Sequence, residues 1–191
     1  MRTGVIPACA TRIACWASVG LLVITCTSNN DKTRATGRVQ PSVVTARTEG
    51  GRTVLDVRSV GASHVLTVDR DATVASSAAP TRATVVGEIA GQVVVVVDSY
   101  RSIAGGMSYC GAGVERFLRV LSIAVVPPVE TYRLKLASCR DNIELAVDSM
   151  AWQPDSAALR VHWLNGPNAR HRAQVTTLRI ARDGQTRAIV E

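Results

Sequence analysis

The stretch that decides the fold is Gln92-Val93-Val94-Val95-Val96-Val97-Asp98, a run of five valines with a polar residue at each end. Valine is branched at Cβ, which restricts its side chain in a helix and favours the extended backbone of a strand. A strand with one wet face alternates apolar and polar residues, and this run does not alternate. The sequence therefore predicts a strand that is covered on both faces and central in its sheet.

Short segments of similar composition lie on both sides of this run, and each of them ends at Gly, Pro, Asp or Ser. Several alternate with a period of two, so that Leu159, Val161 and Trp163 would point to one face of a sheet. We expect Trp163 to be a core residue for this reason. The predicted strands cover residues 42–48, 53–59, 64–69, 84–89, 92–98, 115–124, 132–138, 143–148, 159–164, 175–181 and 187–190.

Turn-forming residues separate the predicted strands. Asp183-Gly184, between the last two of them, is a strong hairpin signal, and Gln153-Pro154-Asp155-Ser156 predicts another turn. Gly50-Gly51 marks a further break, and residues 72–83 are predicted to form a long surface loop. Many short strands without a convincing helix indicate an all-β fold, a single β-sandwich or barrel-like domain of antiparallel strands over residues 41–191.

The chain begins with a basic region that carries Arg2 and Arg12, and the uncharged run 13–25 follows it. A basic start before an apolar run of roughly 7–15 residues is typical of a secretory signal peptide. The run is too short for a helix that spans a membrane, which needs about 20 apolar residues. We predict a signal peptide over residues 1–25 and a flexible tether, rich in Ser, Thr, Asn and charged residues, over residues 26–40.

The end of the apolar run, Val23-Ile24-Thr25-Cys26, resembles the lipobox of bacterial lipoproteins. The resemblance covers about the first 30 residues and implies cleavage before Cys26 and lipid on its sulfur. Thr27 in the next position resembles the sorting pattern for the outer membrane, which implies a lipoprotein that faces the periplasm. Two alternatives stay open: cleavage nearby, for example after Ser28, which leaves a soluble periplasmic or secreted protein, and an uncleaved N-terminal anchor.

The five cysteines divide by position. Cys9 and Cys15 lie in the predicted signal peptide, and Cys26 is the predicted lipid acceptor. Export places the remaining two, Cys110 and Cys139, in an oxidising compartment, where an even pair of cysteines favours a disulfide. We therefore predict one disulfide between Cys110 and Cys139.

The formal net charge is +7, from 22 basic and 15 acidic residues, but the basic residues are spread along the sequence. A surface that binds nucleic acid needs a clustered basic face or a known module, and the sequence has neither. We predict no nucleic-acid partner. The expected partners are the membrane, through lipid on Cys26, and an envelope protein.

A glycine-rich stretch, Gly105-Gly106-Met107-Ser108-Tyr109-Cys110-Gly111-Ala112-Gly113, follows the valine strand. A phosphate-binding loop needs a third spaced glycine at the start of a helix, whereas a strand is predicted here. We expect these glycines to let the chain bend around the disulfide. Cys110 with His162 or His171 could supply a nucleophile and a base, and adding Cys139 gives four candidate zinc ligands without the close paired spacing of zinc sites.

Carboxylates could in principle form the pair that glycoside cleavage requires, which depends on distances that a sequence does not give. No motif brings the candidate groups together, so we predict no catalytic residue, no cofactor and no metal site. The carboxylates considered are Glu115, Asp141, Glu144, Asp148 and Asp155.

Three functions remain open from the sequence. The first is a non-enzymatic envelope lipoprotein whose disulfide-linked β domain acts as a binding or structural module, with an exposed strand edge or apolar patch. The second is a β-barrel carrier of a small ligand or lipid, which needs an interior cavity lined by the Val and Leu strands. The third is a secreted hydrolase, which needs a nucleophile, a base and an orienting group in contact. We favour the first.

Overall fold

The structure is a computed structural model, and it describes residues 41–59, 61–75, 77–102, 113–168 and 172–191. The fold is all-β, as predicted, and each predicted strand overlaps a strand of the structure. The predicted signal peptide, the tether and Cys26 lie outside the described residues. The elements are β1 (Val43–Glu49), β2 (Arg52–Ser59), β3 (Ala62–Val68), β4 (Arg82–Ile89), β5 (Val93–Arg101), β6 (Val114–Ser122), β7 (Val129–Ala137), β8 (Glu144–Gln153), η2 (Pro154–Ser156), β9 (Ala158–Asn165), β10 (Gln174–Ile180) and β11 (Thr186–Val190).

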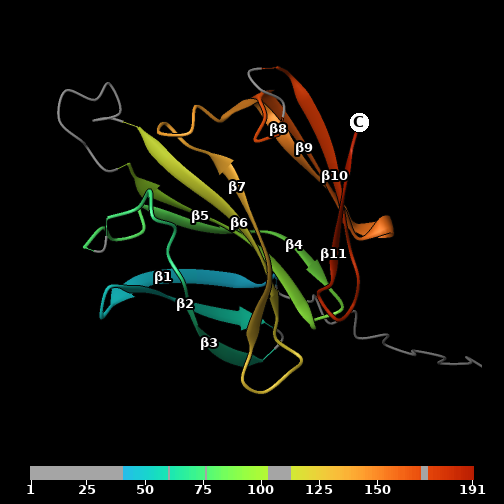
Figure 1. The fold of residues 1–191 in the computed structure, drawn as a ribbon. Coiled ribbons are helices and arrows are strands. Elements are labelled where there is room, and N and C mark those ends of the chain that lie inside the picture. Colours follow the sequence, from blue (N-terminus) through green and yellow to red (C-terminus); the bar gives the residue numbers. More distant parts are fainter. Residues whose placement is uncertain (1–40, 60, 76, 103–112, 169–171) are drawn as a thin grey trace, which may run out of the picture. The chain divides into compact units, whose positions relative to one another are not determined.

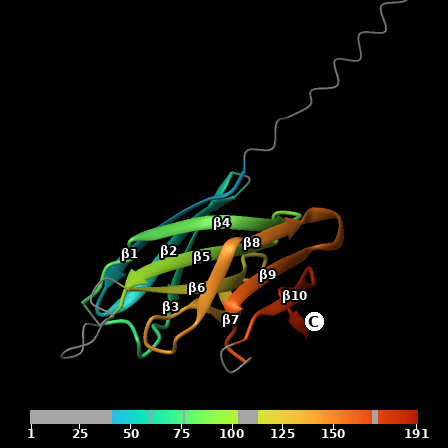
Figure 2. The same cartoon turned by 90° about the horizontal axis from the view of Figure 1, so that it is seen from above.

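The strands form three antiparallel sheets, each built from strands that follow one another in the sequence (Figures 1 and 2). The first sheet has the order β1-β2-β3, the middle sheet β4-β5-β6-β7, and the third sheet β11-β10-β9-β8. Antiparallel neighbours need only short connections, which explains the closely spaced turn signals in the sequence. The architecture is a sandwich in which the middle sheet has a sheet packed on each face.

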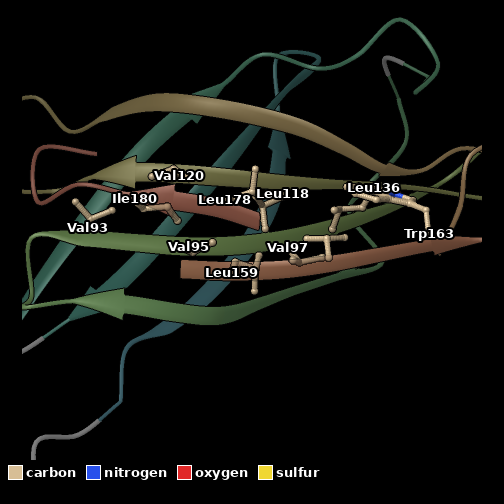
Figure 3. Packing of buried hydrophobic residues seen from close by; sticks show 11 residues of the cluster. Val93, Val95, Val97, Leu118, Val120, Leu136, Leu159, Trp163, Leu178 and Ile180 are labelled. Atoms are coloured by element: carbon tan, nitrogen blue, oxygen red, sulfur yellow. The ribbon is translucent and has the colours of Figure 1, made fainter. Parts of the chain in front are cut away.

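The valine run forms most of β5 and contributes to both apolar clusters of the sandwich. Its odd-numbered valines pack against the third sheet, and its even-numbered valines against the first sheet. Figure 3 shows Val93, Val95 and Val97 together with Leu159 of β9. All five valines are buried, with at most 7% of any side chain exposed. The prediction of a central strand covered on both faces is confirmed.

The period-two prediction for β9 is confirmed as well. Leu159, Val161 and Trp163 all lie in the cluster between the middle and third sheets, and Trp163 is 2% exposed. The indole Nε1 of Trp163 donates a hydrogen bond to the carbonyl oxygen of Leu136, at 2.9 Å. Because Leu136 lies on β7, this bond connects the third sheet to the middle one.

Two predicted turns close hairpins in the structure. Gly50 and Gly51 have φ angles of 54° and 77° and form the whole connection between the paired residues Glu49 and Arg52. Two positive φ angles in succession are what a two-residue hairpin turn requires, and glycine adopts them without strain. The hairpin at Asp183-Gly184 also forms, although its connection is five residues long, 181–185, between the paired residues at 180 and 186.

The segment predicted as a surface loop over residues 72–83 differs from that prediction. Its last two residues begin β4, and Val74 is buried against Tyr100 and Phe117 of the middle sheet. Val74 also forms an isolated antiparallel bridge with Ser102. Small and polar residues surround Val74 in the sequence, so its burial leaves no periodic pattern. The segment covers one end of the middle sheet.

Strand β8 is longer than the predicted range 143–148. Its pairing with β9 shifts between Leu145, opposite Trp163, and Met150, opposite Val161, so extra residues of β8 form a bulge. Asp148 in this bulge has a φ of 52°, and Val147 is 91% exposed. A bulge breaks the alternation on which the sequence prediction depended, and on an edge strand it hinders pairing with another chain.

Among the described residues, no helix is long and apolar enough to cross a membrane.

Candidate functional site

The face of the middle sheet that packs on the first sheet changes from apolar to charged along its length. On β5, Asp98 and Tyr100 follow Val94 and Val96 in the same period of two. On β6, Arg119 precedes Leu121 in the same way. Asp98 and Arg119 are both 0% exposed, so the regular alternation of two central strands carries a carboxylate and a guanidinium into the interior.

The buried charges are paired. The Nε of Arg119 donates to both carboxylate oxygens of Asp98, at 3.0 and 2.9 Å. Its Nη1 donates to the two carboxylate oxygens of Glu130, at 3.0 and 3.1 Å, and to the carbonyl oxygen of Asp69, at 3.2 Å. Glu130 also accepts hydrogen bonds from Nε and Nη2 of Arg133, at 2.7 and 3.0 Å. Two cations and two anions thus neutralise one another.

A tyrosine extends this network to the first sheet. The hydroxyl of Tyr100 donates to Asp98 Oδ2 at 2.5 Å and lies 2.8 Å from the hydroxyl oxygen of Thr53 on β2. Arg70, just after β3, donates from Nε to the same Thr53 oxygen at 3.1 Å and from Nη1 to the carbonyl oxygen of Ala75 at 3.0 Å. Hydrogen bonds therefore connect β2, the segment after β3 and the two central strands of the middle sheet.

Burial determines the protonation of the central pair. Burial raises the pKa of Asp98 above its ordinary value of 3.8, although the charge of Arg119 and the hydrogen bonds from Tyr100 and Arg119 act in the other direction. Burial and the negative charge of Asp98 raise the pKa of Tyr100 well above its usual range. The phenol of Tyr100 therefore stays protonated at neutral pH, and its O–H donates a hydrogen bond to Asp98. Neither group is accessible to a substrate, because Tyr100 is also buried.

The network reaches the surface at a groove of about 500 Å³ lined by residues 67–69 of the first sheet and its edge and by residues 130–133 of β7. Glu130 and Arg133 are 15% and 31% exposed there. Their polar atoms already bind one another and Arg119, so the groove presents an internally neutralised pair.

The carboxylates considered in the sequence analysis do not share one environment. Glu115 is fully buried, and its Oε1 accepts a hydrogen bond from Ser102 Oγ at 2.6 Å. Asp141 is exposed and binds Lys135 of β7. The other three, Glu144, Asp148 and Asp155, are exposed on β8 and η2.

The histidines and cysteines give no assembled site among the described residues. His162 is half-buried on β9, and the described part of the chain holds no group of three or more His, Cys, Asp or Glu side chains that could hold a metal ion. Cys110 and His171 lie outside that part. The candidate nucleophile and zinc ligands are therefore not tested as complete sets, and the absence of a catalytic residue and of a metal site stays a prediction.

Cys139 lies in the turn after β7, against Gly113, the described end of the glycine-rich stretch. A Cβ on Gly113 would lie 2.6 Å from Cys139 Cβ, so only glycine fits this close approach. The predicted partner Cys110 is outside the described residues, and the disulfide stays a prediction.

Sequence reasoning did not single out Asp98, Arg119 or Glu130. The signal that could have identified Asp98 and Arg119 is their position in the period-two alternation. Each falls on the same face of its strand as buried apolar residues, and both strands are covered on both faces. A charge at such a position has to be paired, because an isolated buried charge is very costly. The identity of its partner depends on strand pairing, which local sequence does not specify.

A second ion pair ties the segment after β3 to β7. Lys135 Nζ donates to Asp71 Oδ1 at 3.1 Å, and the same oxygen accepts hydrogen bonds from the backbone N–H and the hydroxyl of Thr73, at 2.9 and 2.7 Å. Partial burial acts to raise the pKa of Asp71, but these hydrogen bonds prevail and hold it below 3.8. Asp71 therefore stabilises the folded state in its charged form.

Replacing this carboxylate should give a small stability loss that depends on pH. We expect Asp71→Asn to lower the free energy of unfolding by about 1 kcal/mol or less at pH 7, since the pair is partly exposed. Because the folded pKa is depressed, the contribution is complete above pH 3.8 and is lost as the pH falls through the lower folded value. Urea unfolding between about pH 2.5 and 7 measures this difference. The exposed Asp155→Asn serves as a control; a loss at pH 7 that persists at the lowest pH would contradict the assignment to charge.

Comparison with family models, with curated proteins and with solved structures finds none that matches this chain.

Proposed function

We propose that the protein is a non-enzymatic lipoprotein of the bacterial cell envelope, held in the membrane by lipid on Cys26. Its β body acts as a binding or structural module, in the periplasm at the outer membrane. The observation that carries the proposal is the buried network of Asp98, Arg119 and Tyr100. These three groups are buried and bind one another, Thr53 on β2 and the backbone just after β3, so they join the first and middle sheets and do not face a substrate.

The packing of the core favours this proposal over a carrier. A carrier cavity would be lined by the Val and Leu strands. A side chain that lines a cavity wide enough for water exposes some of its area to that cavity. The core residues Val93, Val95, Leu118, Val120 and Leu178 expose none, because they pack against one another.

The outer surface offers what a binding module needs. Apolar side chains are exposed on it, among them Val126 at 97% and Val147 at 91%. The outer sheets also end in edge strands, β1 and β3 in the first sheet and β11 in the third, whereas the bulge of the fourth edge strand, β8, hinders pairing. Exposed apolar patches and exposed strand edges are both features through which proteins bind partners.

The proposal predicts that Cys26→Ala releases the protein from the membrane without unfolding it. Acylation of Cys26 would supply the two or more chains that stable anchoring needs, and alanine cannot accept them. The experiment expresses the full chain in a Gram-negative host, separates inner-membrane, outer-membrane and soluble fractions, and measures the intact mass of the mature protein. We expect the parent in the outer-membrane fraction, with a mass that begins at Cys26 plus lipid, and most of the variant in the soluble fraction.

Cys15→Ala is the matched control, because Cys15 lies in the segment that processing would remove. It should leave both the mass of the mature protein and its location unchanged. A Cys26→Ala variant that stays in the membrane, or a parent that carries no lipid, would refute the anchor and favour a soluble periplasmic or secreted protein.

A further inference from the structure

The connection between β6 and β7 exposes an apolar loop without a charge, Ala124-Val125-Val126-Pro127-Pro128-Val129. Val126 is 97% exposed, and Val125 and Val129 are 45% and 43% exposed. Contiguous apolar groups at a surface mark a place that is covered in the working state of a protein. The two prolines have no backbone N–H, so the loop has fewer polar groups to desolvate if it enters a lipid phase.

The loop lies at the end of the sandwich where the chain enters it. Just after the first described residue, Pro41, the hydroxyl of Ser42 donates to Glu88 Oε2 near the end of β4, at 2.6 Å. The N–H of Ile123, where the loop begins, donates to the carbonyl oxygen of Gln92 in the turn after β4, at 2.8 Å. Figure 1 shows the β6–β7 loop at the bottom of the view, on the side where β4 and β11 meet their turns.

The length of the tether keeps this end close to a membrane. Fourteen residues, 27–40, separate Cys26 from Pro41. Fully extended, a chain of that length spans at most about 50 Å. With lipid on Cys26, the end of the body that carries Pro41 stays near the bilayer surface.

A hairpin turn with basic residues lies next to the end of the loop. Thr131, at the start of β7, donates from its hydroxyl to the carbonyl oxygen of Gly184 at 2.8 Å, which places the β10–β11 turn next to the loop's end. This hairpin exposes Arg179, Arg182 and Arg187, against one exposed carboxylate in the same turn, that of Asp183.

Two of these arginines face each other directly, since Arg179 pairs with Arg187 in the β10–β11 register. Like charges at directly opposite positions destabilise a sheet. An anionic group bound between them would relieve this repulsion, and the phosphates of lipid headgroups are anions of that kind at a membrane surface.

We propose that this end of the β body rests on the membrane. The loop 124–129 enters the lipid layer with its valines and prolines, and the guanidinium groups of Arg179, Arg182 and Arg187 bind headgroup phosphates. This inference rests on the proposed function, because lipid on Cys26 brings the body to the bilayer. The ligand is the lipid surface itself.

The test places a fluorescent reporter on the loop of the full, lipidated chain. Val126→Trp is reconstituted in vesicles of phosphatidylethanolamine and phosphatidylglycerol with brominated acyl chains, and quenching is measured after the signal of the parent's own tryptophans is subtracted. Val147→Trp is the matched control, since Val147 is equally exposed but lies on the bulge of β8 in the third sheet. We expect strong quenching for Val126→Trp and little for Val147→Trp. Equal quenching in the two variants would overturn the inference.

A second measurement separates this inference from the anchor. The unlipidated Cys26→Ala chain is sedimented with vesicles of the same lipids, where we expect weak binding. Val126→Asp in that background should weaken the binding about tenfold, because burial of one valine side chain changes an equilibrium constant by about that factor. Val147→Asp should leave it unchanged.

The two proposals fail differently. Lipid found on Cys26 together with equal quenching would leave the anchor in place and refute membrane contact by the loop, which would then be open to a protein partner. If Cys26 carried no lipid, but quenching were specific to the loop and Val126→Asp weakened vesicle binding, the anchor would be refuted and membrane contact by the loop supported.

Discussion

Arg119→Met is expected to lower the free energy of unfolding by about 3–5 kcal/mol, the usual cost of removing one partner from a buried ion pair. Arg119 is 0% exposed and is the cation that pairs with Asp98. Methionine fills much of the volume but leaves the Asp98 carboxylate with the Tyr100 hydroxyl as its remaining side-chain donor. Urea unfolding at pH 7, followed by circular dichroism, measures the loss.

An exposed pair provides the matched control. Arg52 donates to Asp69 at 3.3 Å, and these side chains are 63% and 73% exposed. Arg52→Met should cost less than about 1 kcal/mol, because solvent screens such a pair and its side chains lose entropy in forming it. If Arg119→Met were no more damaging than Arg52→Met, the buried pair would not stabilise the fold as we describe.

The cost of Arg119→Met should fall at low pH. Burial raises the pKa of Asp98, and the positive charge of Arg119 acts to lower it. Removal of that charge therefore raises the pKa further. The folded variant then binds a proton more readily than the unfolded chain, so its stability decreases as the pH rises through the folded pKa and recovers as the pH falls toward 3.8. The double variant Asp98→Asn, Arg119→Met should for the same reason be more stable at pH 7 than Arg119→Met alone. If the stability loss of Arg119→Met did not depend on pH, it would come from lost packing instead of from the unpaired charge.

Most of the fold was predictable because its signals are local. The valines at 93–97 favoured a strand buried on both faces, and the alternation that includes Trp163 identified the inward face of β9. The sheets contain consecutive strands, so each turn signal, such as Gly50-Gly51, also specified a neighbour. The division into three sheets was not predicted, because a turn or loop signal, such as the one over residues 72–83 before β4, does not say whether the next strand pairs with the preceding one or begins a new sheet.

The charged network was not predictable in the same way. Asp98 and Arg119 are 21 residues apart and are brought together by the pairing of β5 with β6, while Glu130 reaches Arg119 across the next pair of strands. Asp98 ends the predicted strand 92–98 and Arg119 lies within the predicted strand 115–124, and in both places local sequence favours a charge that faces solvent. Val74, in the segment after β3, had no periodic signal either. It is nevertheless buried, and it packs against Tyr100 of the same network.

Trp163→Ala is the second change with a large expected effect, a loss of about 3–5 kcal/mol in the free energy of unfolding. Trp163 is the largest of the fully buried side chains and lies where β9 packs on the middle sheet. Truncation to alanine leaves a cavity that neighbours such as Leu136 cannot fill without moving, because both sheets are held by their own ladders of hydrogen bonds.

Trp163→Phe separates packing from hydrogen bonding at this position. Phenylalanine keeps most of the apolar contact but cannot donate to the Leu136 carbonyl oxygen, which now accepts from the indole at 2.9 Å. A buried acceptor that loses its donor costs about 1–3 kcal/mol, so this variant should lie between the parent and Trp163→Ala in urea unfolding. If both variants lost the same stability, the hydrogen bond between the third sheet and β7 would account for the whole effect. A loss below about 1 kcal/mol in Trp163→Ala would show that the interface between the two sheets does not depend on this side chain.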